Sequence, residues 1–100
     1  MKFIIRGMKY DTEKMQKIAT VKKWYREDTA LNRAIFPGQE VGRVHECELW
    51  KSGKGNWLLT HEVGYTDNMG EAITEEEAKA LLMRYATPIY EEMFGALPEA

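Results

Sequence analysis

The stretch ELWKSGKGNWLLTHE, Glu48 to Glu62, limits the fold more than any other part of the chain. The residues from Gly42 to Lys51 and from Asn56 to Gly64 favour strands, because aromatic and branched apolar side chains recur in them. The polar and glycine residues between these segments can only form a tight turn. The sequence therefore predicts a β-hairpin near the middle of the chain.

Side-chain alternation distinguishes two registers of this hairpin. Pairing Trp50 with Trp57 would place glutamates among the apolar residues, so we favour the pairing of Leu49 with Trp57. In the favoured register one face carries His45, Cys47, Leu49, Trp57, Leu59, His61 and Val63, and the other carries Glu46, Glu48, Trp50, Leu58, Thr60 and Glu62. The glutamates of the second face are expected to be solvated.

The segment before the hairpin is predicted to contain an N-terminal helix. Asp11 has the side chain of a helix N-cap, and Tyr10 and Met15 have the spacing of a hydrophobic staple. Apolar residues then recur at helical intervals, namely Met15, Ile18, Val21 and Tyr25. The remaining face would be basic, with Lys14, Lys17, Lys22, Lys23 and Arg26.

Shorter elements surround these two. Residues 3–5 favour a short strand, and a helical turn around Leu31 is predicted to stop at Pro37. Near the C-terminus, Thr74 and Glu77 form a capping box that opens a helix, and this helix breaks at Pro88, where a shorter helix begins. The chain is therefore predicted to be a single α+β domain, residues 1–100, in which a small antiparallel sheet is packed by helices.

The hairpin also brings together residues that could carry chemistry. In the favoured register His45 faces His61, with Cys47 close by on the same side. These side chains could bind a metal ion or form a Cys–His pair, but no fourth metal ligand and no oxyanion-binding motif accompanies them. We therefore expect packing residues here, with no catalytic residue, no metal and no cofactor. The Ser-Gly-Lys-Gly-Asn stretch lacks phosphate-loop spacing and is predicted to be a turn.

Charge and cysteine content narrow the setting. The net charge of −2 provides no general attraction to nucleic acid or to an acidic membrane. The single cysteine and the short apolar run at the start of the chain favour a cytoplasmic protein. A local basic patch of Lys22, Lys23 and Arg26 on the predicted helix, together with Trp50, Lys51 and Lys54 at the hairpin turn, keeps binding of single-stranded nucleic acid open as an alternative function.

Three motifs occur in a familiar order: KYDTEKMQKIA, CELWKSGKGNWLLTHEVG and AITEEEAKALL. With them the chain resembles a group of small bacterial proteins common in phages, plasmids and other mobile elements. The resemblance implies a context and no catalytic residue. That context suggests a protein that binds and inhibits a host defence system of the CRISPR or restriction type. The chain departs from the group between Trp24 and Gly42 and after Pro88, where we expect its particular function to reside.

These considerations predict a non-enzymatic protein-binding module. The residues predicted to contact a host protein, or a second copy in a homodimer, are Trp50, Lys51, Lys54, Ile89, Tyr90, Met93 and Phe94. The last four belong to a tail that the small core has little room to bury. Alternatively, the tail folds back over the second face of the hairpin, against Trp50 and Leu58.

Overall fold

Two antiparallel sheets form the framework of the structure, a computed structural model that describes residues 1–27, 30–64 and 67–100. The small sheet pairs β1 (Lys2–Ile5) with β2 (Met8–Asp11), and the large sheet has the strand order β3 (Gln16–Arg26), β4 (Gly42–Lys51), β5 (Trp57–Val63), β6 (Asp67–Ile73). The helices are η1 (Thr12–Lys14), a 3-10 turn, and α1 (Ala30–Ile35), α2 (Glu75–Tyr85) and α3 (Thr87–Phe94). The predicted α+β class is confirmed.

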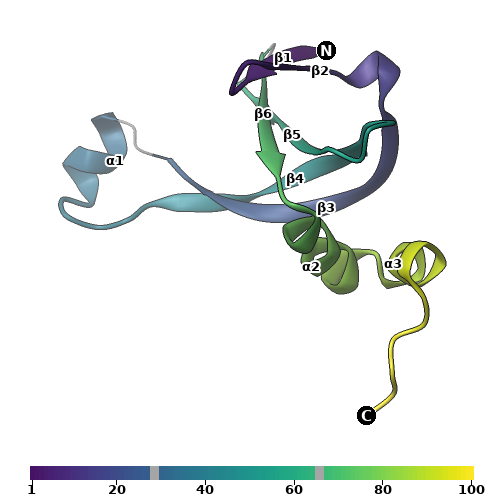
Figure 1. Ribbon diagram of the computed structural model, residues 1–100. Coiled ribbons are helices and arrows are strands. Elements are labelled where there is room, and N and C mark those ends of the chain that lie inside the picture. Colours follow the sequence, from purple (N-terminus) through teal and green to yellow (C-terminus); the bar gives the residue numbers. More distant parts are fainter. Residues whose placement is uncertain (28–29, 65–66) are drawn as a thin grey trace.

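The large sheet lies between two layers (Figure 1). Helices α2 and α3 cover one face, where the core consists of Ala19, Val21, Cys47, Leu49, Trp57, Leu59, Ile73, Ala78 and Leu82. The β1–β2 ribbon covers part of the other face, on which Leu58 and Thr60 are buried. A Cβ atom at Gly70 would lie 2.7 Å from the Phe3 ring, so glycine allows β1 to approach the sheet closely.

The central hairpin forms as predicted, but its register differs. Lys51, and not Leu49, lies opposite Trp57, because the Ser52 carbonyl accepts from the Gly55 N–H at 3.0 Å and closes a shorter turn. The difference moves the pairing by two residues and therefore leaves both predicted faces unchanged. Cys47 and Leu49 are accordingly buried on the helix-covered face.

The predicted N-terminal helix is wrong beyond its first turn. Asp11 does cap a helix, accepting from the Glu13 N–H at 3.1 Å, but that helix is only the 3-10 turn η1, and the chain then continues as β3. A β-bulge between Lys17 and Ala19 interrupts the alternation of β3 and brings Ile18 to the core as well. Apolar residues on either side of the bulge imitate helical spacing, and long-range pairing with β4 favours the strand.

The C-terminal elements agree closely with the prediction. The Thr74 hydroxyl accepts from the Glu77 N–H at 3.1 Å and caps α2. The helix breaks at Ala86, two residues before the predicted Pro88, and Pro88 lies in the first turn of α3. The short helix around Leu31 is confirmed as α1.

The large sheet divides into two ribbons at one end. The β4–β5 ladder ends at the pair Glu48–Thr60, whereas β3–β4 pairing continues to Arg26–Gly42 and β5–β6 pairing to Val63–Asp67. We call this division the fork. The part of the β3–β4 ribbon beyond it, residues 22–26 and 42–46, with α1 at its tip, we call the arm, and it projects from the rest of the molecule in Figure 1.

Candidate functional site

Side chains from all four strands of the large sheet meet in the fork, on its helix-covered face. We call this group the fork cluster, and it consists of Lys23, Tyr25, His45, His61 and Glu71. Strand alternation positions the group, because residues two apart along a strand point to the same face. The cluster thus connects the arm to β5 and β6 where the backbone ladder is interrupted.

Glu71 on β6 provides the polar half of this connection. Its carboxylate accepts from Lys23 Nζ at 2.8 Å and 3.0 Å and from the Tyr25 hydroxyl at 3.0 Å. Both donors belong to β3, which forms the edge of the sheet opposite β6. One carboxylate therefore joins the two edges of the sheet.

Aromatic rings provide the apolar half. The Tyr25 ring stacks on His61, with centroids 4.1 Å apart and planes inclined by 20°. His45 completes the group, with its ring centroid 4.9 Å from that of His61. The two histidines therefore come together as predicted, although the observed register makes them diagonal neighbours.

A second carboxylate, Glu27, extends the network towards the tip of the arm. Its Oε1 lies 2.7 Å from Arg43 Nε and 3.3 Å from His45 Nε2. Its main-chain N–H donates to the Val41 carbonyl at 2.7 Å, beyond the last residue pair of the ribbon. Glu27 thus links the fork cluster to the loop that carries α1.

Burial determines the protonation of the remaining groups. It raises the pKa of the Cys47 thiol, which is fully buried and donates to the His45 carbonyl at 3.4 Å. Burial and the hydrogen bond to Glu71 raise the pKa of Tyr25, whereas burial and the neighbouring His45 lower the pKa of His61. At neutral pH the thiol and the phenol keep their protons, which makes both poor nucleophiles.

Two cavities adjoin the cluster, one of about 440 Å³ bordered by Tyr25 and Met69 and one of about 890 Å³ bordered by Glu46 and Thr60. His61 Nδ1 is buried without a hydrogen-bond partner among the described residues. Within that same part of the chain, no three His, Cys, Asp or Glu side chains are arranged to hold a metal ion. The geometry suits a structural connection between the two ribbons.

The arm has a different character, because its apolar side chains face solvent. Trp24 is 46% exposed and its cross-strand neighbour Val44 is 57% exposed. At the tip, Leu31, Ile35 and Phe36 of the α1 segment are also exposed.

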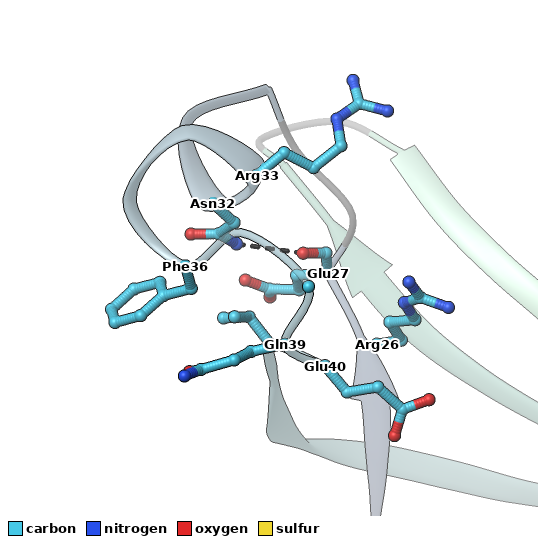
Figure 2. Close-up of a pocket in the computed structure, with 9 residues that line it drawn as sticks. Arg26, Glu27, Asn32, Arg33, Phe36, Gln39 and Glu40 are labelled. Carbon is cyan, nitrogen blue, oxygen red and sulfur yellow. Dashed lines mark hydrogen bonds between the residues drawn. The ribbon is translucent and has the colours of Figure 1, made fainter.

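Hydrogen bonds hold the tip of the arm in shape. Asn32 Nδ2 donates to the Glu27 carbonyl at 2.9 Å (Figure 2). The Phe36 N–H donates to the Asn32 carbonyl at 2.8 Å. A cavity of about 350 Å³ lies between α1, the end of β3 at Arg26 and the loop of residues 38–41. The Phe36 ring points away from the ribbon in Figure 2, so the tip presents it outward.

The predicted contact residues of the hairpin and the tail lie apart from the arm. Trp50 is half-buried and its indole donates to Thr60 at 3.0 Å, Lys51 lies over the Trp57 ring, and Lys54 is exposed in the turn. The tail residues Ile89, Tyr90, Met93 and Phe94 are partly buried against the core under α2. The alternative placement of the tail against Trp50 and Leu58 is wrong, because α3 packs on the opposite face.

The predicted nucleic-acid residues are separated by strand alternation. Lys22 and Arg26 lie on the face that carries Trp24, whereas Lys23 faces the fork cluster and pairs with Glu71. The expected basic helix face therefore does not exist, because its residues belong to a strand.

No helix in the described ranges is both long and apolar enough to span a membrane. No protein-family description matches the chain, and neither the curated proteins nor the solved structures give a significant match.

Proposed function

We propose that this protein is a non-enzymatic protein-binding module and that the arm is its contact surface. One observation carries the proposal: a ribbon that projects from the molecule exposes Trp24, Val44 and the apolar residues of its tip. Clustered apolar side chains on a surface favour association with another protein, because burying them removes apolar area from water. Aromatic residues such as Trp24 are also enriched at the centres of protein interfaces.

The dimensions of the molecule support the same proposal. The Cα radius of gyration is 15.7 Å, whereas a compact chain of this length has a value of about 13 Å. The arm and the C-terminal segment after α3 both extend from the sheet in Figure 1, and both contribute to the difference. A projecting arm buries little apolar area and therefore adds little to the stability of the fold, but it is well placed to contact a partner.

The fork cluster favours binding over catalysis. Glu71 and Glu27 both have cationic partners, and the Cys47 thiol is buried and protonated. The cluster fixes the direction of the arm and offers no activated nucleophile. The cytoplasm, where a single thiol stays reduced, remains the proposed compartment.

Nucleic-acid binding remains the alternative function, because Lys22 and Arg26 flank Trp24 on one face. The same face carries Glu46 opposite Lys22 and Glu48 further along β4. These carboxylates oppose phosphate binding. The geometry thus gives more support to a protein partner.

The identity of the partner is proposed from the resemblance alone. The arm contains the segment between Trp24 and Gly42, where the chain departs from the related small proteins of mobile elements. We therefore propose that the arm selects the partner of this particular chain. A component of a host defence complex, of the CRISPR or restriction type, is the target to test first.

Site-specific photocrosslinking tests the proposed contact surface. We expect a benzoylphenylalanine residue in place of Phe36 to give a defined protein adduct in bacterial lysate, and the change Ile35→Asp to remove this adduct. The control places the same probe at Met8, which is similarly exposed on the β1–β2 ribbon. Equal adducts from both positions, or none from Phe36, would argue against the arm as the contact surface.

A further inference from the structure

Strand β3 has a free edge along the arm. It is 11 residues long and stands at the end of the strand order, and β4 is its only neighbour among the strands that the structure describes. Among the described residues, no hydrogen bond joins a main-chain group of residues 18–26 to an element other than β4. In an antiparallel sheet, the main-chain groups of every second residue then point outward and are available to another strand.

The side chains along this edge form a regular stripe. Every second residue of this part of β3, namely Lys22, Trp24 and Arg26, lies on the same face. Their respective cross-strand neighbours are Glu46, Val44 and Gly42. A Cβ atom at Gly42 would lie 2.5 Å from Trp24 Cζ2, so the indole leans over the glycine. The stripe thus presents a cation, an exposed aromatic ring and a second cation.

Strand β3 is basic, although the chain as a whole is acidic. Its sequence QKIATVKKWYR contains basic residues and no carboxylate, although the whole chain has a net charge of −2. Lys17 and Lys23 have carboxylate partners at 3.4 Å and 2.8 Å in Glu48 and Glu71. Lys22 lies opposite Glu46, but among the described residues neither Lys22 nor Arg26 forms an ion pair. Both cations can therefore attract an acidic strand that lies alongside the edge.

We infer that the partner of the arm adds an extended segment to the free edge of β3, with acidic, apolar and acidic residues alternating on the side of Trp24. This inference rests on the proposed function and specifies the kind of partner. Opposite charges on neighbouring strands attract, and an apolar residue beside Trp24 is removed from water. A second copy of the chain is a poorer occupant, because its β3 carries the same cations.

Amide exchange measured by NMR tests the pairing directly. The probe is a short blocked peptide in which threonines alternate with glutamate, leucine and glutamate, and the matched control has lysine in place of glutamate. We expect the acidic peptide to slow exchange at those β3 amides that point away from β4. The basic peptide should leave them unchanged, because it meets Lys22 and Arg26.

Charge reversal provides the second test. The double change Lys22→Glu and Arg26→Glu should weaken the acidic peptide by roughly tenfold and allow the basic peptide to bind. The control, Lys9→Glu with Lys54→Glu, alters the net charge equally at exposed positions away from the arm and should retain the preference for the acidic peptide.

Three results would overturn the inference. Unchanged exchange with the acidic peptide would mean that the lysines only protect the edge from pairing. Protection that rises with protein concentration in the absence of peptide would identify a second copy as the occupant. Binding of an oligothymidylate at Trp24 without amide protection would identify a nucleic-acid surface. If the acidic peptide leaves exchange unchanged but the photocrosslinking probe in place of Phe36 still gives its protein adduct, the proposed function stands and only the strand pairing fails.

Discussion

Glu71 is one of the residues that fix the position of the arm. Its carboxylate accepts from both Lys23 and Tyr25 and connects the two edges of the large sheet. We expect Glu71→Gln to lower the free energy of unfolding by about 1 kcal/mol, because a half-exposed ion pair contributes modestly and a charged hydrogen bond is weakened. Urea unfolding measures this loss. Glu62→Gln, at an exposed position on the other face, should leave the unfolding free energy nearly unchanged.

His61 gives the protein a defined sensitivity to acid. Burial and His45 lower its pKa in the folded state, and Glu71 and Lys23 also act on it, with Tyr25 stacked on the ring. As pH falls below about 6.5, the unfolded chain binds a proton that the folded chain resists. The contribution of His61 is therefore present above that pH and is lost below it.

Replacing His61 by phenylalanine separates this effect from other acid effects, because the ring is kept and the titration is removed. Urea unfolding at about pH 7.5 and about pH 5.5 should show a larger loss of stability in the native protein than in His61→Phe. Equal losses in the two proteins would place the acid sensitivity elsewhere.

Gly42 controls the contact between Trp24 and the returning strand of the arm. A Cβ atom there would lie 2.2 Å from the Tyr25 carbonyl oxygen and within 2.7 Å of the Trp24 ring. We expect Gly42→Ala to cost about 1–3 kcal/mol and to shift the NMR signal of the Trp24 indole. Gly53→Ala is the matched control, because nothing lies within 4 Å of its added atom. Similar losses for both variants would show that the arm tolerates the added methyl group.

At the scale of elements, α3 is a layer over the core and not a free surface. Its apolar residues Ile89, Tyr90, Met93 and Phe94 are packed against the core cluster. Deleting residues 87–100 should therefore lower the free energy of unfolding by about 3 kcal/mol or more, since partly buried apolar area is lost. A shorter deletion of residues 98–100, all exposed, should be neutral. If the longer deletion leaves stability unchanged, the tail is an interface, as the sequence had suggested.

The elements that could be predicted are those with local signals. The strand ends on either side of Gly55 and the cap at Thr74 are short-range features, and both formed where expected, although the pairing register of the hairpin differed. Strand β3 was misassigned because its bulge disguises the alternation. Strand β6 was missed because the segment DNMGEAI has few apolar residues and gains its place from pairing with β5.

Only part of the candidate site could be predicted from the sequence, because some of its contacts are local to the hairpin and others depend on long-range strand pairing. The approach of His45 and His61 followed from the hairpin faces. The contact between Lys23 and Glu71 joins residues 48 positions apart and depends on the order of four strands. The exposed stripe of the arm could not be foreseen while β3 was assigned to a helix.

At the scale of the whole molecule, the arm determines the shape. Solution X-ray scattering should give a monomer mass and an extended form, consistent with the Cα radius of gyration of 15.7 Å and principal extents of 47 × 38 × 23 Å. A radius near 13 Å would mean that the arm folds back onto the sheet. A doubled mass would support the homodimer that the sequence left open.

The interrupted ladder between β4 and β5 has an evolutionary consequence. Where two ribbons are joined by backbone hydrogen bonds, their relative direction changes only if the sheet is rebuilt. Here side chains such as Glu71 and Tyr25 set that direction. Single substitutions in the fork can therefore change the direction of the arm relative to the sheet, and substitutions at the tip can change which partner the arm binds. Direction and specificity can thus be selected independently.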